Sequence, residues 1–497
     1  MSGFSLSDQL PALQVVLPLI AAPLAFIIRR EALIWAFCTV VAWLTFAVSW
    51  SLLGQVQAEG TISYAMGGWV APWGIQYRID IVNAYVALIV SGIAAVVFPY
   101  ARHSVLKEIR GDRIPAFYSL LLLCLTGLLG MTVTGDAFNL FVFLEISSLS
   151  MYSLISLGQD RRAFTAAFQY LVMGTIGGTF VLIGVGFLYE VTGTLNMIDL
   201  AERLPDVTRL RTLHTAFAFL VVGIGLKLAL FPLHLWLPNA YAFAPSVATV
   251  FIAATATKVA VYALLRFVFT IFGVEVSFQD LPLDQIFVVL GSIAILSASA
   301  VAIFQQNVKR MLAYSSVAQI GYIVLGIALA TSAGLQASLL HLFNHALMKG
   351  ALFMAMGCLF YRLGSVQIGD LGGIARVMPW TFGAFALGGL SLIGVPLTVG
   401  FISKWYLVLA ILERGWWPLA ALVLLGSLLA IVYIWRVVET AWFGSPSPRN
   451  ESAREAPAGM LIATWTLVLA NLYFGIQTDL TVGIARQAAD VLMDGAP

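Results

Sequence analysis

Charged residues are scarce in this sequence of 497 residues. Asp, Glu, Lys and Arg make up 10% of the chain, whereas 61% is hydrophobic and the mean hydropathy is +0.95. A soluble globular domain carries roughly 25% charged residues, so this composition excludes an ordinary soluble protein. The sequence predicts an all-α, multi-pass integral membrane protein in which residues 1–497 form a single membrane domain within the lipid bilayer.

Cysteine is also rare. Cys38, Cys124 and Cys358 each stand alone in an apolar run without a CxxC pair, which argues against iron–sulfur, zinc and disulfide frameworks. The glycines of 174–186 are not followed by the GK[ST] of a phosphate-binding loop. No cluster of lysine and arginine indicates nucleic acid, and no basic region precedes the first apolar run, as a signal peptide would require. We therefore expect no cofactor, no metal, no nucleic-acid partner and no cleaved leader.

Long apolar runs are abundant, and runs of about 18–25 residues are long enough to cross a bilayer as helices. About fourteen such spans are predicted, and the seventh and twelfth contain internal prolines. The spans are 11–28, 32–54, 80–100, 114–134, 137–157, 164–189, 213–237, 247–272, 285–305, 309–330, 335–361, 381–411, 416–438 and 458–478.

Basic residues fall unevenly on the two sides of these spans. One set of loops carries 14 of them and the other carries 6. Because cytoplasmic loops are enriched in lysine and arginine, the first set is predicted to be cytoplasmic, which places both termini outside the cell (inner) membrane. The first set is Arg29, Arg30, Arg102, Lys107, Arg110, Arg113, Arg161, Arg162, Lys309, Arg310, Arg362, Arg376, Arg449 and Arg454, and the second is Arg78, Arg203, Arg209, Arg211, Arg414 and Arg486.

The sequence repeats internally. Residues 145–158 match 313–326 at an offset of 168, and residues 186–200 match 357–371 at an offset of 171. This offset carries the fifth span onto the tenth, so the two copies cross the membrane in opposite directions. We predict two inverted five-helix repeats, over 114–272 and 285–442, each with a broken helix, followed by a C-terminal transmembrane helix at 458–478. Inverted repeats with broken helices are typical of transporters, whose sites lie near the bilayer midplane.

The stretch 223–241 holds the first broken helix. Lys227 lies in an apolar run and Pro232 follows five residues later, so the helix must kink or end there. Backbone carbonyls freed in lipid need protein or water partners, and a charged side chain at mid-membrane is usually kept to bind or move charge. His234 is either a relay member or the partner of a freed carbonyl.

Glu145 is the one carboxylate predicted deep within a span, and its counterpart in the second copy is Ala313. A nearby carboxylate favours the charged form of a lysine, whereas burial favours the neutral amine. Separation of Glu145 from Lys227 would therefore release a proton. The alternative is a purely structural ion pair.

Two further lysines are predicted within the membrane. Lys404 follows Pro396, the counterpart of Pro232, by eight residues, so the copies carry their lysines on opposite sides of equivalent breaks. Lys258 lies in the middle of the eighth span and is placed to receive a proton from Lys227 through water. Snorkelling to the membrane surface or helix packing are the alternatives.

His341, His345 and Lys349 are spaced four residues apart and share one face of a helix. Two histidines at this spacing suit zinc, but no third ligand or HExxH glutamate accompanies them. Histidine accepts and releases protons near neutrality because its ordinary pKa is about 6.5. The pattern favours a proton relay, with a structural hydrogen-bonded pair as the alternative.

Four segments together resemble the antiporter-like subunits shared by Mrp-type cation/proton antiporters, respiratory complex I and membrane-bound hydrogenases. They are GDAFNLFVFLE, GLKLALFPLHLWLPNAYAFAPSVATVFIAATATKVAVYALLR, NVKRMLAYSSVAQIGY and HLFNHALMKGALF. The resemblance runs from about Gly67 to Trp442, and PNAYAFAPS and VTGTLNMIDL are most similar to the D-type polypeptide of the multisubunit Mrp-type sodium/proton antiporters.

The resemblance implies roles for individual residues. In this family protons are thought to move along a hydrated mid-membrane axis that joins two half-channels. A histidine that some relatives carry in helix eight is replaced here by Ile252, which leaves Lys258 as the candidate at that point. The positions that match the family's functional residues are Glu145, Lys227, Lys258, His341, His345, Lys349 and Lys404.

We therefore predict a proton-translocating transporter subunit, not an enzyme, in a hetero-oligomeric monovalent cation (Na⁺)/H⁺ antiporter built with other membrane subunits. One alternative is a proton-pumping membrane-arm subunit of an NADH:quinone oxidoreductase or a membrane-bound hydrogenase, driven by redox chemistry in partner subunits. The other alternative is a non-conducting scaffold subunit whose charges only hold helices together.

Overall fold

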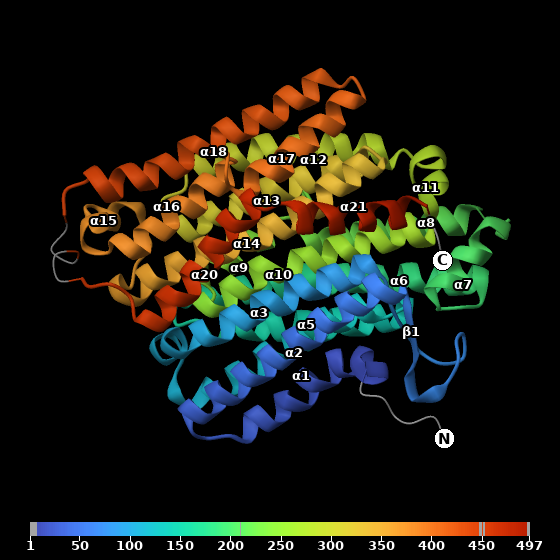
Figure 1. Ribbon diagram of the computed structural model, residues 1–497, viewed down its shortest axis with the longest axis horizontal. Coiled ribbons are helices and arrows are strands. Elements are labelled where there is room, and N and C mark those ends of the chain that lie inside the picture. The colour runs from blue at the N-terminus through green and yellow to red at the C-terminus, as the bar shows by residue number, and fades with distance from the viewer. Residues whose placement is uncertain (1–6, 209, 447–449, 451–452, 495–497) are drawn as a thin grey trace.

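The long helices of the protein run roughly parallel to one another in a bundle (Figure 1), seen in a computed structural model that describes residues 7–208, 210–446, 450 and 453–494. The long helices are α1 (Leu10–Ile27), α2 (Glu31–Glu59), α3 (Ile81–Glu108), α4 (Ile114–Val133), α5 (Ala137–Ser156), α6 (Arg162–Thr192), α8 (Leu210–Leu228), α10 (Ser246–Leu265), α12 (Leu283–Ile303), α13 (Val308–Ala328), α14 (Ser332–Leu363), α18 (Trp417–Phe443) and α20 (Ala458–Ile476).

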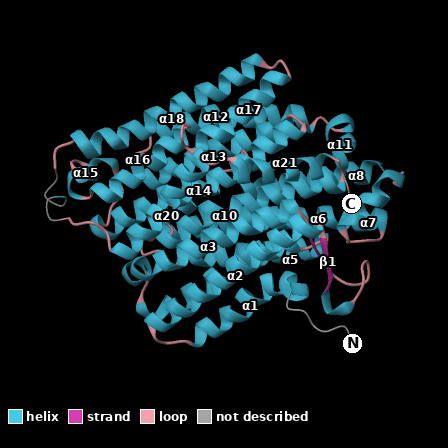
Figure 2. Ribbon diagram, in the orientation of Figure 1, coloured by secondary structure: helices cyan, strands magenta, loops and turns pink. Residues whose placement is uncertain are grey.

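Shorter elements complete the fold. The short α-helices are α7 (Met197–Arg203), α9 (Trp236–Phe243), α11 (Gly273–Glu275), α15 (Ile374–Val377), α16 (Pro379–Ile393), α17 (Val399–Glu413) and α21 (Asp479–Met493). Single turns of 3₁₀ helix are η1 (Ser7–Gln9), η2 (Met66–Gly68), η3 (Gly111–Arg113), η4 (Leu204–Asp206) and η7 (Ile368–Leu371), and π-helical turns are η5 (Arg266–Ile271) and η6 (Val276–Asp280). Strands β1 (Ile62–Ala65) and β2 (Gln76–Ile79) pair antiparallel, and Figure 2 shows this small sheet at one end of the bundle.

The described residues contain 13 helices that are long and apolar enough to cross a membrane. This confirms the predicted all-helical membrane fold of about fourteen spans, and the remaining predicted span is made of two shorter helices. The twelfth predicted span, 381–411, is divided into α16 and α17, each too short to cross alone. The seventh predicted span, 213–237, is likewise divided, because α8 ends at Leu228 and the chain becomes helical again in α9.

Burial separates the central helices from the outer ones. Every residue of α10 is buried, and α13 and α14 are buried along most of their length. Helices α2, α6 and α18 instead expose large apolar side chains such as Trp43, Phe168 and Trp435. Because lipid is as apolar as these side chains, the exposed faces suit a bilayer, and the polar residues of the centre are screened from it.

The structure contains both predicted breaks. The first lies between α8 and α9, around Pro232, and the second lies between α16 and α17, around Pro396. At the second break Gly394 ends α16 with φ +95°, a conformation that side chains disfavour and glycine accepts readily. Proline ends each helix because it lacks a backbone donor and clashes with the preceding turn.

Backbone hydrogen bonds repeat at the offset of 171 that the sequence shows. The amide of Ala137 donates to the carbonyl of Leu195 at 2.9 Å, and 171 residues later the amide of Val308 donates to the carbonyl of Val366 at 2.9 Å. A second pair of hydrogen bonds is also related by 171 residues. The amide of Met197 donates to the carbonyl of Gly135, and the amide of Ile368 donates to the carbonyl of Gln306. Equivalent positions in the two copies therefore form equivalent contacts.

The two copies point in opposite directions. In Figure 1, α7 follows the first set of these contacts at the right-hand end of the bundle, and α15 follows the second set at the left-hand end. We call the end that carries α15 and the loops 28–30 and 109–113 the basic end, since arginines cluster there. Two of the arginines counted for the orientation, Arg209 and Arg449, lie outside the described residues. The exact boundaries of the repeats, 114–272 and 285–442, stay a prediction.

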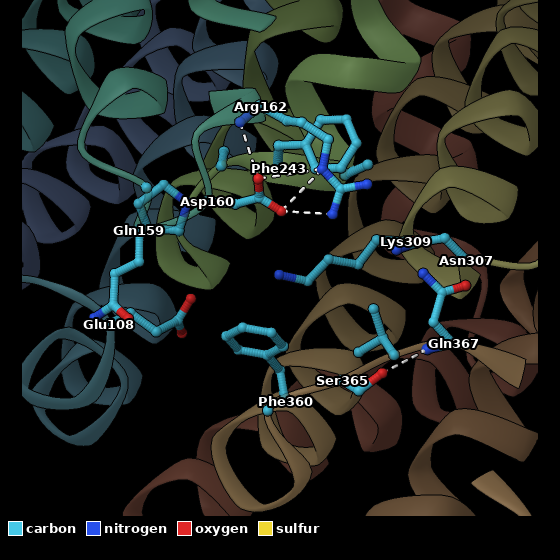
Figure 3. Close-up of a pocket in the computed structure, with 16 residues that line it drawn as sticks. Glu108, Gln159, Asp160, Arg162, Phe243, Asn307, Lys309, Phe360, Ser365 and Gln367 are labelled. Atoms are coloured by element: carbon cyan, nitrogen blue, oxygen red, sulfur yellow. Dashed lines mark hydrogen bonds and ion pairs between the residues drawn. The ribbon is translucent and has the colours of Figure 1, made fainter. Parts of the chain in front are cut away.

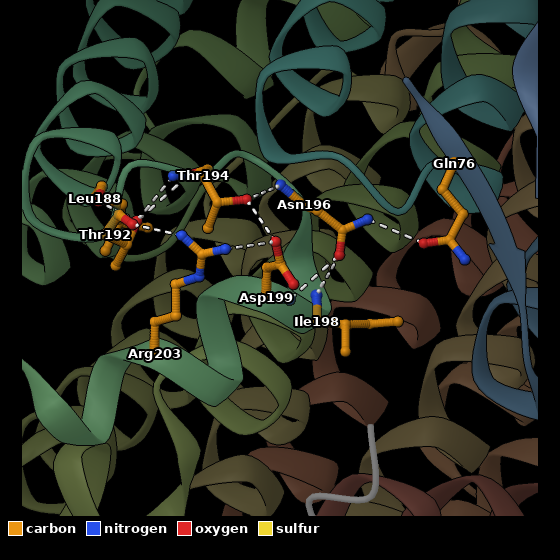
Figure 4. A network of polar contacts seen from close by, with 8 residues as sticks. All are labelled: Gln76, Leu188, Thr192, Thr194, Asn196, Ile198, Asp199 and Arg203. Atoms are coloured by element: carbon orange, nitrogen blue, oxygen red, sulfur yellow. Dashed lines mark hydrogen bonds and ion pairs between the residues drawn. The ribbon is translucent and has the colours of Figure 1, made fainter. Parts of the chain in front are cut away.

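Helix α1 begins and α21 ends away from the basic end (Figure 1). There the side chain of Asn196 caps α7 by accepting from the amides of Ile198 and Asp199, and its amide group donates to Gln76 of β2 at 2.9 Å (Figure 4). This contact joins the first repeat to the hairpin. The sequence reasoning did not predict the hairpin or α21, which packs against α3 and α14 after the predicted C-terminal span.

Candidate functional site

Glu145 and Lys227 form an ion pair between α5 and α8, with Lys227 Nζ 3.2 Å from Glu145 Oε1. The ammonium also donates to Ser148 Oγ at 2.8 Å and to Tyr152 OH at 3.3 Å. All three partners lie on α5, where Ser148 and Tyr152 follow Glu145 at helical spacing. The lysine side chain is 6% exposed and the glutamate 25% exposed, so the pair is shielded on the lysine side and more open on the other.

A glycine on α6 makes room for the glutamate. A Cβ atom at Gly178 would collide with Glu145 Oε1, whereas a Cβ at Gly186 of the same helix would meet nothing within 4 Å. The carboxylate therefore lies directly against the α6 backbone. Because Gly178 has no side chain, the Glu145 carboxylate can occupy this position.

Lys258 of α10 and Lys349 of α14 lie near each other in the buried centre of the bundle. Lys258 Nζ donates to the carbonyl of Ala253 at 2.6 Å, and Lys349 Nζ donates to the carbonyl of Leu312 at 2.8 Å and to Ser315 Oγ at 2.5 Å. The two amines are close enough to interact electrostatically. Among the described residues no carboxylate pairs with either amine, which are both fully buried. Two buried lysines near each other without a carboxylate partner are costly, which makes this pair unusual for a purely structural site.

We call the series of buried titratable side chains in this site the line. His341 and His345 extend it along α14. Their rings stack at 6.1 Å between centroids, and both interact electrostatically with Lys258 and Lys349. His341 Nδ1 lies 2.9 Å from Ser403 Oγ of α17. Within the described part of the chain, neither nitrogen of His345, nor Nε2 of His341, has a hydrogen-bond partner. Buried polar groups nearly always have a partner, so these nitrogens indicate positions for water along the line.

Lys404 is the last group of the line and lies at the second break. Its ammonium donates to the carbonyls of Leu392 and Ile393, at 3.0 and 2.9 Å, and to Ser427 Oγ at 3.0 Å. Leu392 and Ile393 are the last residues of α16, whose carbonyls have no partner within the helix. The sequence reasoning predicted that such carbonyls would need partners, and here the lysine itself supplies one. Lys404 also interacts electrostatically with His341.

At the first break, a different side chain binds a backbone carbonyl at the end of the helix. The indole nitrogen of Trp236, the first residue of α9, donates to the carbonyl of Leu226 in the last turn of α8 at 2.9 Å. His234 stacks on Phe231 and faces Tyr314, and its Nδ1 has no partner among the residues that the structure describes. Within the same residues, His234 forms no hydrogen bond with Glu145, Lys227 or Lys258. Ile252 is buried in α10, as expected for an apolar replacement.

The line has one gap. Among the described residues, no hydrogen bond or electrostatic interaction joins Lys227 to Lys258. The structure thus brings the predicted residues together in two groups. One contains Glu145 and Lys227, and the other contains Lys258, His341, His345, Lys349 and Lys404.

A polar cavity of about 180 Å³ opens at the basic end, next to the start of α10 (Figure 3). Glu108 Oε2 accepts from the backbone amide of Ser246, the first residue of α10, at 2.8 Å, and Lys309 Nζ donates to Ser246 Oγ at 2.9 Å. Asp160 and Arg162 line the opposite wall, and their ion pair holds the pKa of Asp160 below its usual range. The cavity is large enough for several waters and leads towards the helix that carries Lys258.

Sequence reasoning missed several of these groups. Lys309 is predicted among the basic residues of the cytoplasmic loops, yet its side chain is buried and its ammonium lies 4.9 Å from the Phe360 ring centre. Tyr152, Ser403 and Ser427 were not singled out, because a lone hydroxyl in an apolar helix gives no signal until its neighbour is known. The spacing of Tyr152, seven residues after Glu145, puts both side chains on one face of α5 and is the one signal that could have identified it.

The described residues contain no group of three or more His, Cys, Asp or Glu side chains placed to hold a metal ion. The arrangement is a series of buried titratable side chains, several of which lie within hydrogen-bond distance of hydroxyl groups. Such a series can pass protons by steps.

Known proteins share this fold and sequence. The family model described as NADH:quinone oxidoreductase/Mrp antiporter, TM, matches residues 134–430. The N polypeptide of the NADH-quinone oxidoreductase of Desulforudis audaxviator is 43% identical over 462 residues, covering 91% of each chain. The D polypeptide of the Na(+)/H(+) antiporter of Bacillus subtilis is 29% identical over 487 residues, covering 97% of each.

Solved structures agree with these relatives. A chain of the membrane-bound sulfane sulfur reductase (MBS), an archaeal respiratory membrane complex, superposes with a TM-score of 0.89 at 32% identity, covering 98% of both chains. A chain of the Mrp complex from Dietzia sp. DQ12-45-1b superposes with a TM-score of 0.90 at 25% identity, covering 99% of this chain and 98% of the other. The predicted resemblance is thereby confirmed: the chain belongs to the NADH:quinone oxidoreductase/Mrp antiporter transmembrane family, the antiporter-like proton-translocating subunits of Mrp and complex I.

Proposed function

We propose that this chain is the proton-translocating subunit of a multisubunit monovalent cation (Na⁺)/H⁺ antiporter in the inner cell membrane, with both termini outside. The observation that carries the proposal is the line of buried titratable groups that ends at a broken helix on each side. Buried ionisable groups in a membrane are costly and are usually kept for function.

Proton movement along this line begins at the cavity of the basic end. Its polar walls give water access to the start of α10, and Lys258 lies three helical turns further along the same helix. Lys258, His345, Lys349 and His341 then exchange protons through hydroxyls and water, and Lys404 passes them to the opposite side. Neighbouring groups interact electrostatically, and water at the unpartnered nitrogens of His341 and His345 would carry the proton between them.

The Glu145–Lys227 pair regulates proton movement along this path. While the carboxylate stays near, the ammonium keeps its proton, and movement of Glu145 away favours release. Water bridges the gap between Lys227 and Lys258. Glu145 is the more exposed member of the pair, so it is the member that has more room to move.

The test is sodium- and potassium-dependent proton flux in vesicles that carry the whole complex. We expect Glu145→Ala to abolish flux while assembly stays normal. Lys227→Arg keeps the positive charge but cannot deprotonate, so it also stops flux. Full flux in the arginine variant, with normal assembly, would favour a scaffold role instead.

A second function is favoured by one specific observation. The relative at 43% identity is named as part of an NADH-quinone oxidoreductase, and one superposed structure belongs to a respiratory membrane complex. In that case the same line carries protons, and redox chemistry in partner subunits drives it. Flux driven by a sodium gradient alone supports the antiporter. Flux that requires an electron donor supports the redox-driven complex.

A further inference from the structure

A groove opens sideways from the bundle beside the first break, outside the line of titratable groups. It has a volume of about 490 Å³ and lies between α6, α9 and α13. Phe168 and Leu235 form its rim and are more than half exposed, and Trp236 and Tyr314 form its floor. The groove therefore opens on the outer surface of the bundle, between apolar side chains.

The groove is polar at one end and apolar at the other. Arg310 is the third residue of α13, so it lies only about 5 Å from the start of that helix at the basic end. Gln169 and Asn239 bond to each other at 2.9 Å on the opposite wall. Further from that end the lining is Val172, Met173 and Leu235. This order matches the bilayer, where about 5–8 Å of headgroup region covers the hydrocarbon.

Arg310 carries a charge without a counterion. Among the described residues it forms no ion pair, and its Nε is buried without a hydrogen-bond partner. Arg266, Arg162 and Arg203 are each bonded to an aspartate, so Arg310 differs from them. A guanidinium in this state is a strong site for a phosphate, which it can bind through two parallel hydrogen bonds.

We propose that this groove binds one anionic phospholipid, with its phosphate on Arg310 and an acyl chain against Leu235, Val172 and Met173. Basic pockets between transmembrane helices on the cytoplasmic side are suited to anionic headgroups. The site is separate from the proposed proton path and does not depend on it. The chain of contacts from Trp236 to Tyr170, stacked at 3.8 Å between ring centroids, and on to Tyr152 beside Lys227, nevertheless connects its floor to the ion pair.

The test uses the assembled complex in membranes that contain a photoreactive phosphatidylglycerol or a phosphatidylcholine with the same photoreactive acyl chain. We expect the phosphatidylglycerol probe to label peptides 168–173 and 235–239, and the phosphatidylcholine probe to label them weakly. Arg310→Gln should lower the phosphatidylglycerol labelling about tenfold or more, because it removes a charge-assisted contact. Arg161→Gln removes an exposed charge at the same end and should leave the labelling unchanged.

Three results would overturn the proposal. The first is equal labelling by the two probes in the wild-type complex, and the second is labelling of Arg310→Gln at the wild-type level. The third is a protein cross-link, formed in the intact complex from a photoreactive amino acid at Val172, which would show that a partner helix fills the groove. A cross-link to lipid from the same position agrees with the proposal.

Discussion

At the scale of single residues, the two lysines beside the breaks are held by different partners. Lys227 binds a carboxylate, a serine and a tyrosine of α5, whereas Lys404 binds two backbone carbonyls and a serine. A full negative charge holds a proton on Lys227, and only partial charges hold one on Lys404. The two sites therefore differ in how readily they give up a proton.

Gly178→Ala tests the position of Glu145. The new methyl group collides with the carboxylate, so the ion pair with Lys227 must lengthen. We expect proton flux in vesicles to fall roughly tenfold, the effect of losing about 1.4 kcal/mol of a charged hydrogen bond.

Gly186→Ala is the matched control on the same helix, because its methyl group meets nothing within 4 Å. Flux should stay at the wild-type level there. Equal flux in the two variants would show that the close approach of Glu145 to α6 does not matter.

At the scale of elements, the breaks and helix ends position the charges. Gly394 turns the chain at the end of α16 with φ +95°, and a Cβ there would lie 3.1 Å from Lys404 Cδ. Gly415 has a similar φ of +72° with nothing within 4 Å. Both glycines have a positive φ that other residues disfavour, but only Gly394 lies next to the side chain of Lys404.

Gly394→Ala should therefore reduce both thermal stability and proton flux, since the lysine must move from the carbonyls of Leu392 and Ile393. Gly415→Ala should cost a similar backbone penalty, about 1–2 kcal/mol, with normal flux. Thermal unfolding and vesicle flux measure the two effects separately. If Gly394→Ala conducts normally, the fixed position of Lys404 is not required.

The ion pair of Asp80 and Arg266 fastens the hairpin to the π-helical end of α10, with both oxygens 2.6 Å from one guanidinium nitrogen. Asp80 also caps α3 through the amides of Val82 and Asn83. Asp80→Asn leaves a buried arginine without a counterion, which costs about 3–5 kcal/mol.

Thermal unfolding of the detergent-solubilised complex should show a clear loss of stability for Asp80→Asn. The exposed pair of Asp112 with Arg110 supplies the comparison, since such pairs contribute only about 0–1 kcal/mol. Equal melting temperatures for Asp80→Asn and Asp112→Asn would contradict the anchoring role.

At the scale of the whole molecule, the repeated contacts place equivalent segments at opposite ends. Glu202 lies in α7 at one end and Gly369 in η7 at the basic end, and both are exposed. The three native cysteines are buried, so they give little background in labelling.

A membrane-impermeant maleimide applied to intact cells should label Glu202→Cys but not Gly369→Cys. In everted vesicles the labelling should reverse, because the predicted orientation places the basic end in the cytoplasm. Labelling of both positions from one side would contradict the opposite placement of the two copies.

Much of this architecture was predictable from the sequence. Apolar runs predicted the helices, prolines predicted the breaks, and internal matches predicted the offset of 171. The pairing of Glu145 with Lys227 was also predicted, because a lone buried carboxylate needs a partner.

Other features depended on contacts between distant residues. Lys309 reads as a surface lysine from its place at a helix start, and only the approach of Ser246 and Phe360 buries it. The absence of a direct interaction between Lys227 and Lys258 depends on how α8 and α10 pack, which spacing along the chain does not give. The groove at Arg310 requires three helices to be placed at once.

The contact of Lys404 with the end of α16 has a consequence for the proton that Lys404 carries. The last carbonyls of a helix carry partial negative charge, and the ammonium neutralises it. When Lys404 becomes a neutral amine, that compensation is lost. The proton on Lys404 is therefore held at the same place where it stabilises the open carbonyl end of a broken helix.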